Sequence, residues 1–185
     1  VPTITPVQAG QILQKLCDAN VVAVLGASPC VEGLREMTEG LMRLSGGADA
    51  REFGEMLAKQ VLSHAGVDSG LITGDPGWQS AISEMFREME TARIESPAIL
   101  LSRSRLIERD PLQRLRLLDR ASQLVEPNDG AALQELANDY MSLLKRGEAL
   151  APLRRLRQLP TTTAPQLQII NHNIEALENA ERASK

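Results

Sequence analysis

VVAVLGASPCVEGL, residues 21–34, is the stretch that decides the fold. An apolar run followed by a glycine and Ser28-Pro29 occurs where a strand enters a cofactor turn, and also where one helix meets the next. After an expected helix at 29–45 comes ADAREFGEMLAKQVL (48–62), a second helical pattern in the place where a βαβ unit needs a strand. We therefore predict a helical corner, in which a helix that begins near Pro6 runs on through the valines and ends at Gly26, and Ser28 caps the next helix.

Two other interpretations of this stretch stay open. One is a structural strand that binds no ligand. The other comes from the turn LGAS (25–28), which resembles the glycine turn of nucleotide- and CoA-binding Rossmann domains over a short stretch. The resemblance implies an enzyme that holds a nucleotide or CoA at Gly26 and Ser28. The sequence supplies one glycine at the turn where the dinucleotide fingerprint has three.

The composition favours an all-α fold. Hydrophobic residues make up 43% of the 185 residues, but aromatic residues only 2%. The core must then consist of Leu, Ile, Val, Met and Ala, a set that suits helices better than β-sandwiches. We expect an irregular bundle of about seven or eight helices, and the methionines are expected to fill its core.

Cap residues and glycines mark the expected helix ends. Helix starts with a capping side chain are predicted at Thr5, Asp49, Asp75 and Asp110. Gly66 is expected to end the third helix, and a loop should follow at 66–78. Gly147 is expected to interrupt the chain before a short basic helix at 150–160.

The C-terminal part is predicted to be separate from the body. TTTAP (161–165) is typical of a polar hinge, so we expect a bundle domain at 1–160 and a hinge with a terminal helix at 161–185. The apolar stripe of that helix is narrow, so the helix is expected to project or to pack on a partner. The candidate partner-binding residues are Leu167, Ile170, Ile174 and Leu177.

The charge distribution suggests one further candidate site. The net charge is −4, with a balance of −5 over residues 1–93 and +1 over 94–185, which argues against a general binder of nucleic acid or anionic membranes. Two arginine-rich stretches, 103–120 and 143–157, nevertheless offer an alternative function as a nucleic-acid-binding regulator. The possible basic patch comprises Arg103, Arg105, Arg114, Arg116, Arg120, Arg154, Arg155 and Arg157.

Cysteines and histidines give no expected metal, cofactor or catalytic site. Cys17 and Cys30 are too few for a zinc site, and His64 and His172 have no serine, cysteine or acid at a spacing that indicates a nucleophile–base pair. We expect the cysteines to be two separate buried thiols; a disulfide is the alternative in an oxidising compartment.

These observations predict a non-catalytic helical protein that acts through protein–protein interaction, and not an enzyme. It would be a structural or assembly component of a larger complex such as a secretion apparatus, a pilus or a virion. Its partners would be other protein chains, including copies of itself. The sequence shows no signal peptide and no apolar run long enough to span a bilayer, so the chain is expected to be soluble, either cytoplasmic or exported or virion-associated after processing.

Overall fold

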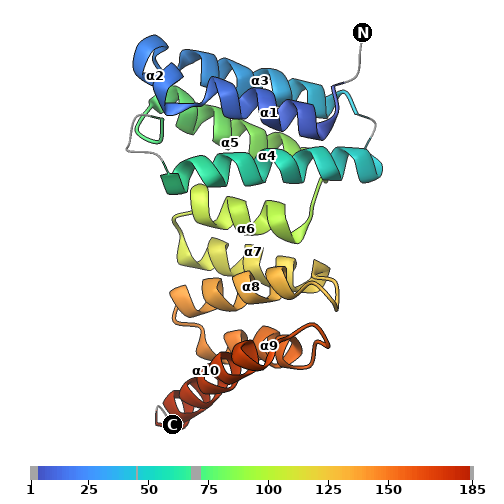
Figure 1. The fold of residues 1–185 in the computed structure, drawn as a ribbon, viewed down its shortest axis with the longest axis vertical. Helices are drawn as coiled ribbons and strands as arrows, with labels where there is room; N and C mark the ends of the chain where they lie inside the picture. Colours follow the sequence, from blue (N-terminus) through green and yellow to red (C-terminus); the bar gives the residue numbers. More distant parts are fainter. Residues whose placement is uncertain (1–3, 45, 68–71, 184–185) are drawn as a thin grey trace. The chain divides into compact units, whose positions relative to one another are not determined.

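A computed structural model of the chain describes residues 4–44, 46–67 and 72–183, with side chains omitted at 65–67. Within these ranges the chain forms ten α-helices and no strand, so the predicted all-α class is confirmed, although the number of helices is higher than expected. The chain divides into two compact units, Val1–Ile107 and Glu108–Lys185 (Figure 1). Each unit is described by itself.

Unit 1 contains six helices, arranged around α3 and α4 (Figure 1). Helix α3 packs against α1, α2, α4 and α5, while α4 packs against α1 and α6. The bounds of the helices are α1 (Pro6–Leu16), α2 (Ala19–Leu25), α3 (Ser28–Met42), α4 (Gly47–Val67), α5 (Pro76–Thr91) and α6 (Pro97–Leu106).

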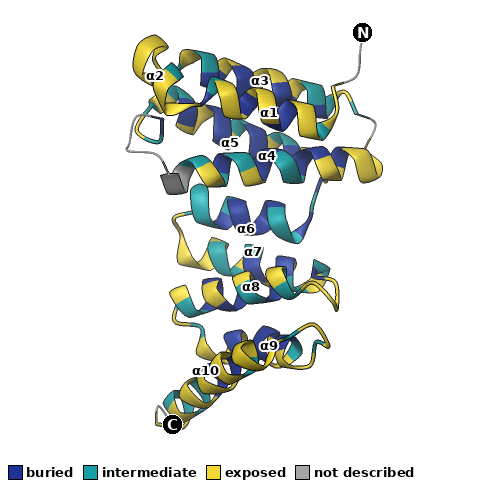
Figure 2. Cartoon of the chain, viewed as in Figure 1, coloured by how far each residue is buried: buried dark blue, intermediate teal, exposed yellow. Residues whose placement is uncertain are grey.

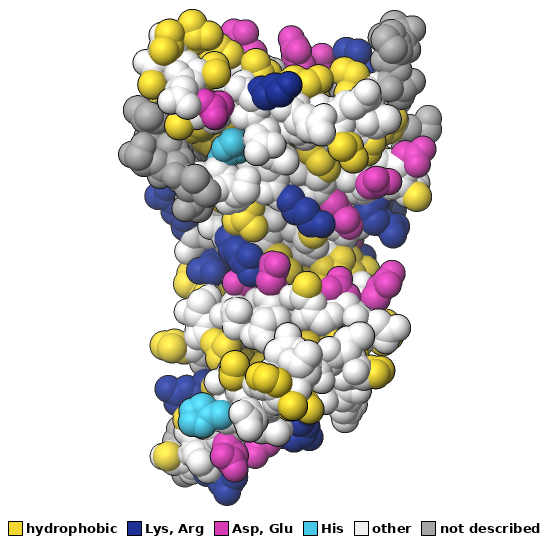
Figure 3. All heavy atoms as spheres, viewed as in Figure 1, with side chains coloured by type: hydrophobic (Ala, Val, Ile, Leu, Met, Phe, Trp, Pro, Cys, Tyr) yellow, Lys and Arg dark blue, Asp and Glu magenta, His cyan; other side chains and the backbone are white. Residues whose placement is uncertain are grey.

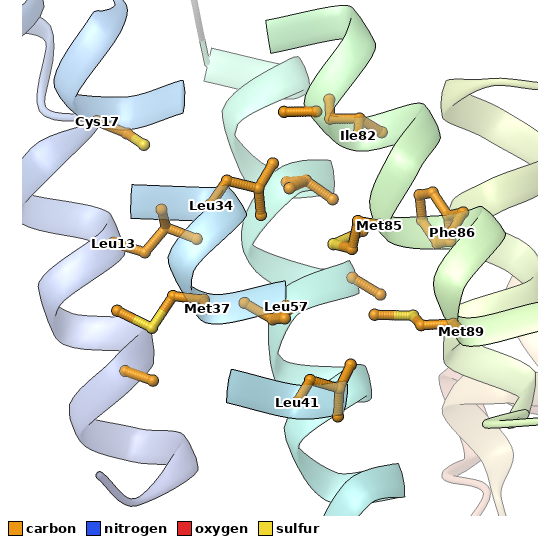
Figure 4. Packing of buried hydrophobic residues seen from close by; sticks show 14 of the residues in the cluster. Leu13, Cys17, Leu34, Met37, Leu41, Leu57, Ile82, Met85, Phe86 and Met89 are labelled. Carbon is orange, nitrogen blue, oxygen red and sulfur yellow. The ribbon is translucent and has the colours of Figure 1, made fainter. Parts of the chain in front are cut away.

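The core of unit 1 is built from aliphatic and methionine side chains, as the composition predicts. Leu13 of α1, Leu34 of α3 and Leu57 of α4 are fully buried, and α5 adds methionines and Phe86 from its inner face (Figure 4). Each such side chain contributes about 1.5–3 kcal/mol through removal from water. This core holds the helices around α3 together.

The structure has a helix–helix corner at Gly26, as predicted for residues 21–34, but it has neither one continuous helix from Pro6 to Gly26 nor a cap at Ser28. The helix that begins at Pro6 stops at Leu16, and a separate helix, α2, starts at Ala19. The break is stabilised by Asp18, whose carboxylate accepts a hydrogen bond from the backbone N–H of Asn20 at 2.9 Å. Gly26 ends α2 at φ +75°, a conformation that favours glycine. This extra break accounts for one helix more than the sequence pattern indicates.

Three of the five predicted caps are confirmed by the structure. Thr5 forms a reciprocal capping box with Gln8, and Asp75 and Asp110 each accept a backbone N–H of the following helix. Asp49 is not a cap, because α4 already starts at Gly47 and Asp49 lies in its first turn. There its negative charge still interacts favourably with the positive end of the helix dipole.

Three further boundary predictions need correction or fall outside the described chain. Ser28 is the first residue of α3 and Ala27 occupies the cap position without a side-chain hydrogen bond. Helix α4 continues past Gly66 to Val67. Of the expected loop at 66–78, residues 68–71 lie outside the described residues.

Unit 2 contains four helices, of which α9 lies between α8 and α10. Their bounds are α7 (Pro111–Leu124), α8 (Gly130–Ser142), α9 (Arg146–Arg157) and α10 (Ala164–Ala183). Gly147 does not interrupt the chain: it lies in the first turn of α9, whose expected start at residue 150 was therefore too late. A side chain at this position would meet Glu181 of α10, since a Cβ there would lie 2.8 Å from its carboxylate.

Helix α10 packs along α9. Its Ile170 and Ile174 are buried, and Arg154 of α9 donates to Glu178 at 2.8 Å. The TTTAP connection is held by Thr162, whose hydroxyl donates to the Leu156 carbonyl at 2.8 Å. The expected hinge and the separate 161–185 domain stay predictions.

A hydrogen bond joins α7 to α8 inside unit 2. The hydroxyl of Tyr140, which is almost fully buried, donates to Asp119 at 2.8 Å. Burial, followed by this hydrogen bond and by the negative charge of Asp119, raises the pKa of Tyr140 above its ordinary value. The tyrosine therefore stays a hydrogen-bond donor across the physiological pH range.

Two helices end in a Schellman motif with a residue other than glycine in the left-handed position. After α5 this residue is Arg93 (φ +56°), and after α8 it is Leu144 (φ +57°). The motif's hydrogen bonds run from Ile94 to Met89 and from Lys145 to Tyr140, each at 2.9 Å between backbone N and O. Both positions carry the steric cost that a Cβ brings in this conformation.

Replacing Leu144 by glycine is expected to stabilise unit 2. Leu144 is 78% exposed, so Leu144→Gly loses little apolar contact and relieves about 1 kcal/mol of backbone strain. The free energy of unfolding, measured with urea and followed by the near-ultraviolet signal of Tyr140, should rise by about that amount. Leu143→Gly is the control, because φ there is −91° and glycine should destabilise. Equal losses in both variants would contradict the prediction.

The Arg154–Glu178 pair makes a prediction about titration. The hydrogen bond from Arg154, helped by the charges of Arg154, Arg182 and Arg157, lowers the pKa of Glu178 below its ordinary value. A lowered pKa in the folded state means that the pair stabilises the fold above the unfolded pKa of Glu178, and that this contribution is lost as the pH falls through the folded pKa.

An NMR titration checks this directly. The pKa of Glu178 should rise toward its ordinary value in Arg154→Gln. It should not change in Arg116→Gln, which removes an exposed arginine that bonds to Gln113 on α7. A Glu178 pKa that is the same with and without Arg154 would show that the pair does not form.

Candidate interaction surface

Exposed apolar side chains gather at the start of unit 1. Among the described residues, five of the eight large hydrophobic side chains that stand out as exposed lie before residue 26. Val24 and Leu25 on α2 are 81% and 63% exposed, and Figure 3 shows hydrophobic side chains gathered over this helix. We call the exposed apolar side chains of this segment the α1–α2 surface; they are Ile4 and Val7 at the start of α1, Ile12 farther along it, and Val24 and Leu25 on α2.

The α1–α2 surface belongs to a segment with almost no charge. Between residues 4 and 31 the only charged side chains are Lys15 and Asp18, of opposite sign, in a chain that is 24% charged overall. Exposed apolar area without interspersed charge is costly in water unless another surface covers it. Figure 2 shows that α2 is largely exposed.

Helix α2 presents its apolar side chains outward because only one of its faces is covered. Val22 is buried where α2 packs on α3 and α1, while Ala23, Val24 and Leu25 remain exposed. We call Val24 and Leu25 the α2 knob. A seven-residue helix with one anchoring valine has little packing of its own, so its position depends on how its ends are held.

A disulfide bond between Cys17 and Cys30 holds both ends of α2. The two Cα atoms are 4.8 Å apart; Cys17 is the C-cap of α1 and Cys30 lies in the first turn of α3, so the closed ring contains all of α2. Both are buried, as the sequence predicts, but the expectation of two separate thiols is wrong. The chain turns back on itself at Gly26, so the first turn of α3 comes beside the end of α1.

Unit 2 contains a groove whose lining carries no charged residue. It has a volume of about 530 Å³ and lies between α9, the 161–162 connection, α10 and the start of α8. Its apolar wall comprises Leu156, Leu159, Ile169 and Ile170, and its other lining residues are glycine, alanine, threonine and glutamine. We call it the α9–α10 groove. Ile169 at its edge is 63% exposed.

Unit 1 has a smaller groove that is lined mainly by charged residues. It measures about 350 Å³ between α3 and α5, and five of its eight lining residues are Arg or Glu. Arg35 and Glu84 on its two sides approach to 3.7 Å. Charges that already pair across the groove leave little net field for a charged ligand, so we assign it no site.

The candidate stripe on α10 faces inward for the most part. Ile170 and Ile174 are buried against α9, and Leu167 and Leu177 are half-buried. A partner that used the whole stripe would have to displace α10 from α9. The assignment of this stripe as a partner site stays a prediction.

The candidate arginines are distributed over both units. Arg103 and Arg105 lie on α6 in unit 1, and the other six lie in unit 2. Several already have protein partners: Arg103 pairs with Glu90 at 3.0 Å, Arg154 with Glu178, and Arg155 donates to the backbone carbonyl of Val125. Their role as a basic patch stays a prediction.

The remaining residues considered in the sequence are Gly26, His64 and His172. Gly26 joins two helices, so the strand that a Rossmann turn requires does not precede it. The ring of His64 contacts Trp78 edge-on with centroids 6.2 Å apart, and His172 is exposed on α10. The described residues hold no cluster of three or more His, Cys, Asp or Glu that could bind a metal.

Comparison with known proteins finds no family model, no curated protein and no solved structure that matches the chain. In the parts of the chain that the structure covers, no helix has the length and apolar character needed to cross a bilayer.

The α1–α2 surface was not predicted from the sequence. The available signal was the run from Ala19 to Val31, which contains thirteen residues and no charge. The valines in this run were assigned to the packing of a helix. A buried helix and an exposed apolar helix have the same pattern, so only the packing around α2 distinguishes them.

Removing the disulfide is expected to destabilise unit 1. The cysteines are 13 residues apart, and opening a ring of this size costs about 3 kcal/mol. The double variant Cys17→Ala, Cys30→Ala should lower the free energy of unfolding by about that amount. Fluorescence of Trp78, the only tryptophan and fully buried in unit 1, follows the transition.

Reductant serves as the matched control for this variant. It should shift the wild-type transition to lower denaturant concentration and leave that of the alanine variant unchanged. If the Trp78 transition of the wild type were identical with and without reductant, the disulfide would not contribute to the stability of unit 1.

Proposed function

We propose that this protein acts by binding another polypeptide through the α1–α2 surface, as a structural or assembly component of a larger complex. The observation that carries the proposal is the group of exposed apolar side chains on a nearly uncharged stretch of sequence, whose α2 part lies inside the ring closed by a disulfide. Covering an apolar side chain such as Val24 or Leu25 contributes about 1.5–3 kcal/mol. A few such side chains at the centre of an interface can supply most of its affinity.

The chemistry of the surface favours a protein partner over a lipid surface. Helices that lie on membranes combine an apolar face with Lys or Arg beside it, and aromatic residues at the headgroup level. Between residues 4 and 31 the only basic residue is Lys15, and the single tryptophan, Trp78, is buried in the core. An apolar segment with one basic residue and no exposed aromatic side chain is better suited to a pocket on another polypeptide than to a headgroup layer.

The disulfide also lowers the cost of binding. A flexible segment loses conformational entropy when it docks, whereas α2 is already fixed at Cys17 and Cys30. The cap at Asp18 and the turn at Gly26 define where the helix begins and ends. Because less conformational entropy is lost on binding, burial of the α2 knob contributes more to the affinity.

The alternative function as a nucleic-acid-binding regulator has less support. It needs arginines that are available to phosphates, and Arg103, Arg154 and Arg155 already contact glutamates or a backbone carbonyl. The enzyme alternative needs a strand before Gly26, where the structure has α2. Binding of a polypeptide is the proposal that uses the exposed features of the described chain.

The proposal predicts that polar substitutions in the α2 knob abolish complex formation. Tagged wild type and the variant Val24→Gln, Leu25→Gln are recovered from their native source under non-reducing conditions, and the masses of the complexes are measured. A defined polypeptide should be recovered with the wild type, and its recovered amount should be at least about tenfold lower with the variant. Both substitutions are at exposed positions, so the fold and the Trp78 transition should not change.

Leu112→Gln is the matched control, because Leu112 is a 67% exposed leucine on a helix outside this surface. It should recover the same complex as the wild type. Complexes of equal amount with all three proteins, or no complex with the wild type, would refute the proposal.

A further inference from the structure

We propose that the polypeptide that covers the α2 knob is a second copy of this chain, and that the knob of one copy enters the α9–α10 groove of the next. This inference rests on the proposed function and names its partner. Knob and groove lie on different units of the chain, so each copy presents both halves of the contact.

The groove determines the chemistry of its occupant. No Asp, Glu, Lys or Arg lines it, and Leu156, Leu159, Ile169 and Ile170 form its apolar wall. A charged occupant would lose its hydration there and find no opposite charge, which is strongly unfavourable. The groove therefore selects a neutral apolar segment. The hydroxyl and amide groups of its threonines and glutamines can meet backbone groups at the rim.

The α2 knob meets this requirement. It lies in the middle of the uncharged run from Ala19 to Val31, and Val24 is the most exposed large hydrophobic side chain among the described residues. A groove of about 530 Å³ has room for side chains of the size of valine and leucine. Two neutral surfaces meet without charge repulsion, in a chain in which 24% of the residues are charged, with both signs present.

The two exposed leucines elsewhere in the chain, Leu112 and Leu144, fit the groove less well. Leu112 is followed closely by Arg114 and preceded by Asp110, and Leu144 precedes Lys145 and Arg146. Inserting either would bring those charges to an uncharged groove. The chain thus holds a convex and a concave apolar surface that match each other in charge and character.

The contact joins two different surfaces, so it is a head-to-tail contact. Such a contact leaves a free knob at one end and a free groove at the other, and further copies add until the ring closes or the chain ends. The protein should therefore associate into oligomers of two or more copies, and the share of these oligomers should grow with concentration.

Complementary variants test this contact. The knob variant Val24→Gln, Leu25→Gln keeps an intact groove, and the groove variant Ile169→Glu keeps an intact knob. All three positions are exposed, so both proteins should fold, which circular dichroism and the Trp78 transition verify. Sedimentation of the purified full chains is measured over a range of concentrations without reductant.

The wild type should sediment as oligomers of two or more copies whose share grows with concentration, and each variant alone should sediment near the 20.2 kDa of one chain. A mixture of the two variants in equal amounts should give a species of twice that mass and nothing larger, because only one contact can form. Gln168→Glu adds the same charge at an exposed α10 position outside the groove lining and should behave as the wild type.

Three results would overturn the inference: a wild type that stays at 20.2 kDa at every concentration, association that Ile169→Glu does not weaken, or variants that fail to complement each other. The proposed function is judged separately, by the complexes recovered from the native source. A monomeric pure protein that still loses another polypeptide when the knob is changed would refute the second copy as partner and leave the proposed function standing.

Discussion

The covalent bond between Cys17 and Cys30 is the constraint on which the exposed features of unit 1 depend. It fixes the two ends of α2, a helix that is too short to be stable alone and that has only Val22 buried beneath it. With its ends fixed, the helix can leave Val24 and Leu25 in water without unravelling. The bond thus replaces the packing that would normally hold such a helix.

In the rest of the fold, the core is filled by unbranched and γ-branched side chains rather than by aromatic ones. This part could be predicted from the sequence, because a core of Leu, Met and Ala with few aromatic residues is best satisfied by packed helices. Caps at Thr5, Asp75 and Asp110 were also predictable, since they act within one turn. The break at Asp18 was not predicted, although its cap on Asn20 is also local, because the apolar pattern continues through it. The start of α9 was not predicted because no side-chain cap marks it.

The candidate site could be predicted only in part. Periodicity identified an apolar stripe at Ile170 and Ile174, but it cannot say whether a helix of the same chain or another molecule covers the stripe; here α9 covers it. For α2 the ambiguity had the opposite outcome, and the valines assigned to packing include Val24, which is exposed. Whether a side chain is buried depends on the neighbouring helices, and the apolar periodicity of one helix does not reveal those neighbours.

The disulfide is also local in the chain, and this affects the order of folding. Its ring spans 13 residues and includes no residue beyond Cys30, so α1 to α3 can be joined before α4 to α10 are in place. A chain that emerges from its N-terminal side into an oxidising compartment would acquire its crosslink first and its C-terminal unit last. The α2 knob of a growing chain would then be folded before the α9–α10 groove of the same chain. Such a chain could bind the groove of a completed copy while its own C-terminal unit was still being made.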